Sequence, residues 1–412
     1  MQAGLAPLLA RYAGRFHALT GQGHGVASPL GAWLLLALCG PASQGEDRAA
    51  ITDALGCGTG EAAGAAAALL AAPHPLVAAA VATWRRRDAD TEALTRWLAG
   101  LPPAAQHGVL TDQADLDRWA REHTYGLIER FPVQLTPDML LVLASALATR
   151  VSWQRPFELA AGRELGPASP WAGRLRQVLR TPAGPGHSQF VAATADAGDV
   201  AVHTARARGG LLVTSVAAAP EVPAQTVLAA AHQLAIAAAL GGEVERRSLF
   251  DLPLGEGPLG TVTERQAMTQ APSGREENCH AVLPAWAASS EHNLARPALG
   301  FPAAASALAG LLALGSFRYE AKQSAMARYS RVGFEAAAVT AVAVAMAAPL
   351  RRPGAVRTAT LRFGHPFAVV AVTADDPGGQ PAGPWHGLPV FSAWVADPQD
   401  ADIPHVPSIR NG

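Results

Sequence analysis

The hydrophobic pattern along the chain predicts a mixture of helices and strands. Apolar side chains at helical spacing indicate an amphipathic helix over residues 5–19. Residues 30–38 are apolar nearly all round, which is typical of a central buried helix, and Ser28-Pro29 supplies its N-cap and first-turn proline. Further helices are expected at residues 46–55, 116–130 and 225–240, and residues 60–98 are expected to form two helices around a strand near 77–84.

Strand composition is clearest near the two ends of the chain. Residues 140–143 suit a buried strand, and residues 367–373 and 388–395 form an apolar pair separated by a turn. Residues 160–280 contain short apolar pieces between prolines and glycines and give no clear pattern. Because segments that would form a core lie at both ends, we expect one intertwined domain spanning residues 1–412.

The stretch that follows Gly333 is the most unusual part of the pattern. Residues 334–348 are almost entirely apolar, with Glu335 as the only charge, and Pro349 ends the run. Its many alanines favour a helix, whereas Val339, Thr340 and Val342 favour a strand that is buried on both faces. Periodicity does not decide between these two structures.

Composition narrows the function classes. Hydrophobic residues make up 50% of the chain and charged residues 16%, so a sizeable core is expected. The net charge of −1 argues against nucleic acid or an anionic membrane as a partner. Nearly all positive charge is arginine, with Lys322 as the single lysine, which is typical of a GC-rich genome. Cys39, Cys57 and Cys279 form neither a disulfide framework nor a metal motif.

The sequence has no constellation that points to catalysis, and we expect no enzyme, cofactor or metal site. Ser28 lacks the flanking glycines of a hydrolase nucleophile, and the histidines have no second histidine at ligand spacing. The N-terminus has no basic region of the kind that begins a signal peptide. Residues 297–314 are apolar, but their Ala and Gly content and Pro302 favour a buried segment over a membrane span.

Several motifs, taken in order along the chain, resemble those of the serpin family. They are Ser28-Pro29-Leu30-Gly31 and the helix after it, Trp119 with Thr124-Tyr125-Gly126, residues 141–157 with Trp153, Pro156 and Phe157, the alanine-rich stretch after Gly333, Phe363-Gly364-His365-Pro366-Phe367, and residues 391–398. The spacing of these motifs over the whole length makes the resemblance specific, and it indicates a divergent, bacterial-type member.

The resemblance implies a fold and a function. The fold would be α+β, a single domain of about eight or nine helices on three β-sheets, with an exposed reactive-centre loop at residues 333–358. The function would be inhibition of a serine protease, which cleaves the loop as a suicide substrate while the loop inserts as a strand into the central sheet. The fold would be metastable, and the protein would act as a monomer. Serpins are mostly extracellular; a cytoplasmic location is the alternative, because no signal peptide is seen.

The resemblance also assigns three groups of residues. The hinge of the loop is Gly333, Phe334, Glu335, Ala336, Ala337, Ala338 and Thr340. The scissile bond lies at Ala347-Ala348 when counted forward from Gly333, whereas counting back from His365 places it near Ala355, and Arg351 and Arg352 are alternatives between them. The gate that controls sheet opening is Trp153, Ser28, Ser145 and Gln323.

Some of these residues depart from the family pattern. Phe334 stands where serpins have a small hydroxyl residue, and a ring at an inward position overpacks a core at a typical cost of about 1–3 kcal/mol. Arg331 replaces the usual Glu, Ser145 an Asn, Gln323 a His and Gly31 a Ser. A non-inhibitory serpin that acts as a binding or interaction protein is therefore the alternative function.

Overall fold

The computed structural model describes residues 2–20, 23–149, 151–315, 317–333, 352–374 and 383–401. The α-helices in these ranges are α1 (Gln2–Thr20), α2 (Pro29–Cys39), α3 (Gly45–Leu55), α4 (Thr59–Ala71), α5 (Glu92–Ala99), α6 (Gln113–His123), α7 (Ala224–Leu240) and α8 (Phe301–Leu311). Short 3-10 turns are η1 (Gly40–Ala42), η2 (Gly162–Leu165), η3 (Leu249–Asp251), η4 (Pro297–Leu299) and η5 (Gly383–Trp385).

Helix α2 is the central helix that the sequence predicts. Every residue of α2 except Leu35 is buried, because the helix is apolar on all sides. The Ser28 side chain caps its first turn by accepting a hydrogen bond from the Gly31 N–H at 3.3 Å, as predicted. The indole of Trp33 is fully buried and donates to the carbonyl of Leu55 at the end of α3, so α2 is fixed against its neighbours.

Helix α6 is shorter than the sequence predicts. It ends at His123, whereas the apolar spacing indicated a helix to residue 130. Tyr125 and Gly126 adopt positive φ angles of 54° and 77°, which are incompatible with a continuing right-handed helix. The Gly126 N–H instead donates back to the carbonyl of Arg121, as at many helix C-termini.

The first sheet unites the two ends of the chain. Its strands are antiparallel in the order β1 (Gly25–Ala27), β17 (Pro389–Val395), β16 (Phe367–Thr373), β9 (Leu211–Ala217), β8 (Gly198–Ala207) and β7 (His187–Thr194). The pairing of β1 with β17 joins residues near 26 to residues near 393. This long-range pairing supports the expected single intertwined domain.

The second sheet contains the strand that follows residue 351. Its order is β10 (Gly255–Gly257), β11 (Gly260–Thr269), β15 (Arg352–Arg362), β12 (Arg275–Leu283), β6 (Gln177–Arg180) and β5 (Glu158–Ala161). Apart from α7, which lies where the sequence predicts a helix, the segment from 160 to 280 gave no clear pattern in the sequence, and its strands belong to these two sheets.

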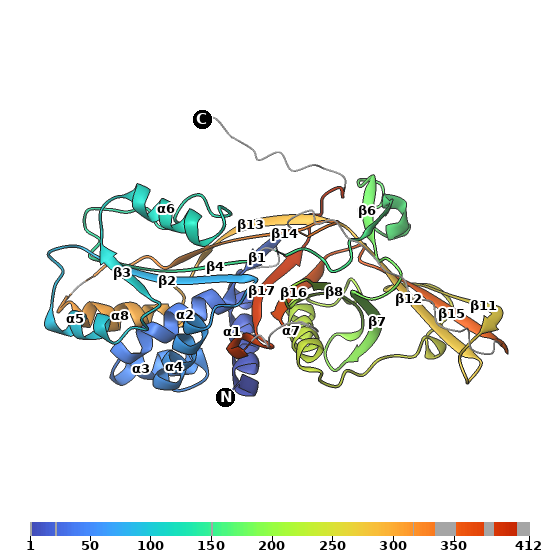
Figure 1. The fold of residues 1–412 in the computed structure, drawn as a ribbon, viewed down its shortest axis with the longest axis horizontal. Coiled ribbons are helices and arrows are strands. Elements are labelled where there is room, and N and C mark those ends of the chain that lie inside the picture. Colours follow the sequence, from blue (N-terminus) through green and yellow to red (C-terminus); the bar gives the residue numbers. More distant parts are fainter. Residues whose placement is uncertain are drawn as a thin grey trace.

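A third group of strands forms the upper layer of the molecule. One part is a sheet of β3 (Gln106–Val109), β2 (Val77–Arg85) and β4 (Leu141–Thr149), and the other part is the pair β13 (Trp286–Asn293) and β14 (Lys322–Tyr329). Figure 1 shows α6 above these strands, and α2 and α8 below them. Strands β11, β15 and β12 project at the opposite end of the long axis from α5 and α8.

The apolar segment at 297–314 forms η4 and α8 in this structure. Among the described residues, no single helix has the length and apolar character needed to cross a membrane; the bent pair α3 and α4 meets both criteria only when its two helices are taken together.

Candidate functional site between strands β4 and β14

Strands β4 and β14 meet at their C-terminal ends. Just beyond β4, Ser152 forms an isolated β-bridge with Gly333, and the Trp153 N–H donates to the carbonyl of Val332 at 3.3 Å. Each strand pairs along its outer side, β4 with β2 and β14 with β13. In the described part of the chain, no strand pairing joins β4 to β14 themselves.

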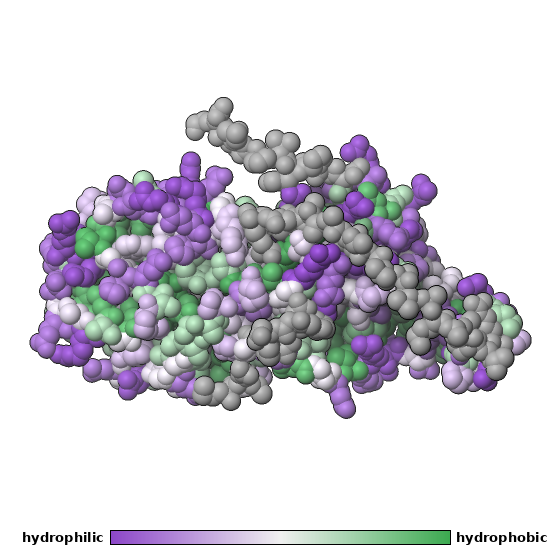
Figure 2. All heavy atoms as spheres, viewed as in Figure 1, coloured by the Kyte–Doolittle hydropathy of each residue, from purple (hydrophilic) through white to green (hydrophobic). Residues whose placement is uncertain are grey.

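A cavity of about 1030 Å³ lies between the two strands, away from their joined ends. Its walls are residues 140–146 of the β4 region, residues 321–324 of the β14 region, and side chains from α2, α6 and α8. The lining is mostly apolar and includes Leu143, Phe301 and Leu308. Figure 2 shows that the face of the molecule seen in Figure 1 carries both apolar and hydrophilic patches. The inner backbone edges of β4 and β14 therefore lie on either side of this cavity.

Trp153, one of the predicted gate residues, lies where the two strands join. Its side chain is buried, and its Nε1–H donates to the carbonyl of Ser330 at 2.9 Å. The indole packs against the ring of Tyr329, with centroids 5.0 Å apart, and lies edge-on to Phe157. Trp153 thus connects the end of β4 to the end of β14 through both a hydrogen bond and ring packing.

Arg331 and Gly333 hold the chain just before residue 334. The Nε–H of Arg331 donates to the carbonyl of Phe157 at 3.1 Å, and the Phe157 N–H donates to the carbonyl of Arg331 at 3.0 Å. Gly333 has a φ of 94°, and a Cβ at this position would lie 2.2 Å from the carbonyl oxygen of Val151. Only glycine fits there without strain.

The remaining three predicted gate residues lie together beneath the strands. The side-chain amide of Gln323 bonds Ser28 twice: Oε1 accepts from the Ser28 N–H at 3.0 Å, and Nε2 donates to the Ser28 carbonyl at 2.8 Å. The Ser28 hydroxyl donates to the carbonyl of Val390, and Ser145 donates to the carbonyl of Gly31 at 2.7 Å. A Cβ on Gly31 would lie 3.3–3.6 Å from polar atoms of Ser28, Ser145 and Gln323, so the Gly leaves room for this arrangement.

Trp153 does not contact Ser28, Ser145 or Gln323 through any of these hydrogen bonds, although the sequence analysis assigns all four residues to one gate. Trp153 acts at the joined ends of β4 and β14, whereas Gln323 and Ser145 face the cavity farther along the same strands. The four predicted gate residues therefore belong to two separate sets of contacts.

A histidine pair beside Trp153 was missed by the sequence analysis. The ring Nε2–H of His187 donates to the carbonyl of Arg155 at 2.8 Å, which leaves its Nδ1 to accept from the Nε2–H of His203 at 3.1 Å. Burial lowers the pKa of both histidines. Phe157 packs on both rings. No local signal marked this pair, because β7 and β8 bring together positions that share no sequence motif.

Most of the predicted loop lies outside the described residues. This holds for Phe334, Glu335, Ala336, Ala337, Ala338, Thr340, Ala347, Ala348 and Arg351. The predicted loop boundary at residue 358 is wrong, because β15 begins at Arg352 and pairs with both β11 and β12. Arg352, an alternative for the scissile bond, is the first residue of β15, and Ala355, the result of the backward count, pairs with strands on both sides.

The described residues contain no group of three or more His, Cys, Asp or Glu side chains arranged to hold a metal ion. Cys39 lies in the wall of the cavity, where burial raises the pKa of its thiol to about 12. Such a thiol is a poor nucleophile at neutral pH.

Comparison with known proteins supports the fold at the level of structure. No family model matches the sequence, and no match to a curated protein was found. Among solved structures, the chain is similar to tengpin, a thermophilic serpin in its native state, with a TM-score of 0.60 and 13% identity over 95% of this chain and 93% of that one. It is similar to human thyroxine-binding globulin with a TM-score of 0.62 and 12% identity, covering 96% of this chain and 99% of that one.

A plant structure gives the same result. The chain matches Arabidopsis AtSerpin1 in its native stressed conformation with a TM-score of 0.57 and 15% identity, over 96% of this chain and 97% of that one. The identities are low, but the matches cover nearly the full length of each protein. The predicted α+β, single-domain architecture is confirmed, and the chain has the serpin fold.

Proposed function

We propose that this protein inhibits a serine protease by offering residues 334–351 as a substrate and inserting the cut chain between β4 and β14. The observation that carries the proposal is that, within the described residues, the inner edges of β4 and β14 have no strand partner and lie on either side of the cavity. A strand placed there would pair with both edges at once, and the serpin fold supports this choice.

The sequence of the stretch after Gly333 fits such a strand. A strand inserted between β4 and β14 is covered on both faces, so its side chains must be apolar or small on both sides. The run from Ala336 to Ala338 meets this requirement, and the apolar residues that follow continue the pattern.

The reaction proposed is the first half of peptide hydrolysis. The protease serine attacks the carbonyl carbon of Ala347, an ester bond forms, the peptide bond to Ala348 breaks, and the nitrogen of Ala348 takes a proton and leaves as an amine. Insertion then moves the ester-linked protease away before water can complete the hydrolysis. Alanine at this position suits an elastase- or subtilisin-like protease, and cleavage after Arg351 would suit a trypsin-like one.

Incubation with a panel of elastase-, subtilisin-, chymotrypsin- and trypsin-like proteases tests the proposal. We expect a covalent complex that survives SDS, and mass spectrometry of the released C-terminal peptide to identify the scissile bond. Thr340→Arg is the control, because a charge on an inserting strand is costly to bury and should turn inhibition into simple cleavage. Cleaved product alone, with every protease, would overturn the proposal.

A non-inhibitory binding role is the second candidate, and Arg331 favours it. Its two hydrogen bonds with Phe157 hold the segment just before the loop in place, which opposes insertion. Thyroxine-binding globulin, one of the similar structures, is bound to thyroxine. Thermal denaturation separates the two candidates, since cutting the loop raises the melting temperature strongly in a protein that inserts it and hardly at all in one that does not.

A further inference from the structure

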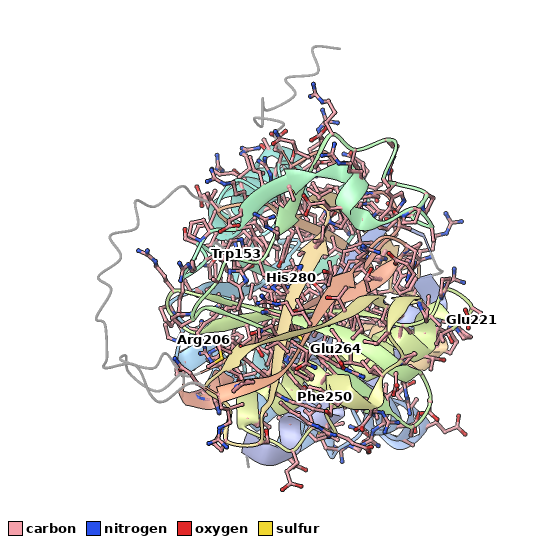
Figure 3. All side chains as sticks on the ribbon, turned by 90° about the vertical axis from the view of Figure 1, so that its right-hand side faces the viewer. Trp153, Arg206, Glu221, Phe250, Glu264 and His280 are labelled. Carbon is pink, nitrogen blue, oxygen red and sulfur yellow. The ribbon has the colours of Figure 1, made fainter. Side chains whose placement is uncertain are left out.

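A second, smaller cavity of about 340 Å³ lies at the C-terminal end of α7, and we call it the α7 pocket. Helix α7 ends here because Gly241 adopts a positive φ of 68°, and the N–H groups of Gly241 and Gly242 both donate to the carbonyl of Ala237. Figure 3 shows Arg206, one of the lining residues, on the opposite side of the view from Glu221, which precedes α7. The pocket is thus bounded by the last turn of the helix and by residues of β7, β8 and β9.

The lining of the α7 pocket combines apolar surface with positive charge. Its larger apolar side chains are those of Phe190, Leu212 and Val244, and its polar side chains are those of His187, Ser188, Thr204, Arg206 and Arg246. None of the described residues that line it is Asp or Glu. A cavity of this size, with apolar walls and a few polar groups, is typical of a site for a small organic molecule.

Arg246 is fixed beside the pocket by pairing with the edge of β7. An isolated β-bridge joins Arg246 to Ala192, and the N–H of Arg247 donates to the carbonyl of Val191 at 2.9 Å. Residues two apart on a strand share a face, so Arg246 is the diagonal neighbour of Phe190. The guanidinium carbon accordingly lies 4.0 Å from the centroid of the Phe190 ring. Strand pairing therefore determines where this positive charge lies.

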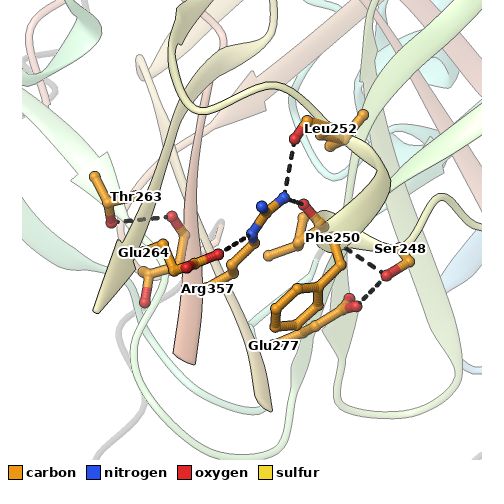
Figure 4. Close-up of polar contacts among 9 residues, drawn as sticks. Ser248, Phe250, Leu252, Thr263, Glu264, Glu277 and Arg357 are labelled. Carbon is orange, nitrogen blue, oxygen red and sulfur yellow. Dashed lines mark hydrogen bonds and ion pairs between the residues drawn. The ribbon is translucent and has the colours of Figure 1, made fainter. Parts of the chain in front are cut away.

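A comparable arginine on β15 shows what Arg246 lacks. Arg357 lies 4.8 Å from the ring centroid of Phe250, and its Nε donates to the carboxylate of Glu264 at 2.7 Å (Figure 4). Arg246 makes the same kind of ring contact with Phe190, but in the described part of the chain it has no ion pair with a carboxylate. The carboxylate that completes the first arrangement is thus missing from the second.

The acidic side chains close to Arg246 in sequence do not supply that carboxylate. Asp199 and Glu245 both pair with Arg247, at 2.9 and 3.5 Å. Glu243 is exposed and is not among the described residues that line the pocket. A carboxylate at Arg246 would therefore have to come from a bound molecule.

The chemistry of the lining selects the class of ligand. A guanidinium can bind a carboxylate through two parallel N–H···O hydrogen bonds, and such charge-assisted bonds are stronger than neutral ones. A cationic ligand would be repelled by Arg206 and Arg246, and a fully polar ligand would leave the apolar walls without a partner. The volume of about 340 Å³ lies at the small end of the range for ligand pockets. These properties favour a small carboxylate with an apolar body.

We propose that the α7 pocket binds a small organic carboxylate. Its anionic group lies on Arg246, and its apolar body packs against Leu212, Val244 and Ala237. Arg206 adds positive charge from the β8 side of the pocket. The site is separate from the cavity between β4 and β14, and the inference does not depend on whether the protein inhibits a protease.

Titration of the full chain with para-fluorophenylacetate, followed by fluorine NMR, tests the site. This probe carries a carboxylate on an apolar ring, and para-fluorophenylacetamide has nearly the same shape without the charge. We expect saturable binding of the acid with a Kd of about 1 mM or lower, and binding of the amide at least about tenfold weaker. Equal binding of acid and amide, or no binding of the acid, would overturn the proposal. Tighter binding of para-fluorophenyl phosphate would overturn the choice of a carboxylate.

Two variants with matched controls locate the binding. Arg246→Gln should weaken binding of the acid at least about tenfold, whereas Arg208→Gln removes the same charge from an exposed arginine outside the described lining and should bind like wild type. Ala238→Phe places a ring in the pocket from the exposed last turn of α7 and should abolish binding. Ala229→Phe, on an exposed part of α7 outside the described lining, should not.

Thermal denaturation establishes that each variant is folded before it is titrated. Because Ala238→Phe acts without changing any charge, it tests the site even if Arg246→Gln fails to fold. Binding at wild-type strength in either Arg246→Gln or Ala238→Phe would overturn the proposal. Equal weakening in Arg246→Gln and Arg208→Gln would assign the effect to net charge and also overturn it.

Discussion

Gln323 holds the backbone of Ser28 at both its N–H and its carbonyl, with distances of 3.0 and 2.8 Å, although the two residues are 295 positions apart. Ser28 stands at the start of the central helix α2, and Gln323 lies near the start of β14. One amide side chain therefore connects the helix beneath the sheet to a strand that borders the cavity. Movement of β14 away from α2 would break both bonds.

Gln323→Ala should lower the free energy of unfolding by about 1–3 kcal/mol, because it leaves the N–H of buried Ser28 without its partner and removes one of the two hydrogen bonds that the Ser28 carbonyl accepts, the other coming from the Ala32 N–H. Ser145→Ala removes a single hydrogen bond, to the carbonyl of Gly31, and should cost about 1 kcal/mol. Urea denaturation of both variants provides the measurement. Equal losses in the two variants would contradict the role given to Gln323.

Gly333→Ala should destabilise the protein by about 1–3 kcal/mol, since alanine is strained at positive φ and its Cβ would meet the carbonyl of Val151. Gly64 provides the control. It lies within α4, and a Cβ there meets nothing within 4 Å, so Gly64→Ala should stabilise the protein by about 0.5–1 kcal/mol. Thermal denaturation should shift the two melting temperatures in opposite directions, and a Gly333→Ala protein as stable as wild type would count against the bridge from Ser152 to Gly333.

Trp153 and Trp286 form a matched pair for testing the contact at the joined ends of β4 and β14. Both indoles are buried against Tyr329, but the Nε1–H of Trp153 donates to Ser330, whereas that of Trp286 has no hydrogen-bond partner among the described residues. Trp153→Phe should therefore cost about 1 kcal/mol more than Trp286→Phe. Denaturant titrations of the two variants measure this difference. A larger loss of stability in Trp286→Phe than in Trp153→Phe would contradict a stabilising role for the hydrogen bond from Trp153 to Ser330.

Acid should destabilise the protein through the buried histidines His17 and His232, whose rings lie 6.2 Å apart between α1 and α7. Burial lowers the pKa of His17 from 6.5 to about 4 and that of His232 from 6.5 to about 3. His292 lowers the pKa of His17 further, and His17 lowers that of His232 further. The Ser392 hydroxyl is hydrogen-bonded to the ring of His17. Both rings are thus neutral when folded and take up protons on unfolding below pH 6.5.

The expected result is full stability above about pH 6.5 and a loss of about 1.4 kcal/mol per pH unit for each of these histidines as the pH falls toward 4. His232→Leu removes one of the two protons and should reduce the slope of unfolding free energy against pH by that amount. The ring nitrogens of His232 have no hydrogen-bond partner in the described structure, so the substitution removes no hydrogen bond. Exposed His107, replaced by Gln, is the control, and an unchanged slope in His232→Leu would contradict the assignment.

The sequence by itself determined the elements with strong local patterns. Helices α1, α2, α3 and α7 lie where their apolar spacing places them, because a helix satisfies its own backbone and needs only a face to bury. Ser28 was also identifiable as an N-cap from the sequence, because a cap bonds a backbone N–H only three residues further along the chain. The motif pattern also indicated the serpin fold, and two of the residues that it singled out, Ser145 and Gln323, line the cavity.

Tertiary structure decided the features that depend on partners distant in the chain. The residues from 352 to 358 were expected to be loop, but β11 and β12 supply hydrogen bonds on both sides and make them strand. The Gln323 to Ser28 bonds, the contact of His187 with His203 and the hydrogen bond from Arg357 to the carbonyl of Leu252 likewise join segments that share no local signal. Strand pairing and buried polar contacts form between residues far apart in sequence, so local propensity and periodicity do not reveal them.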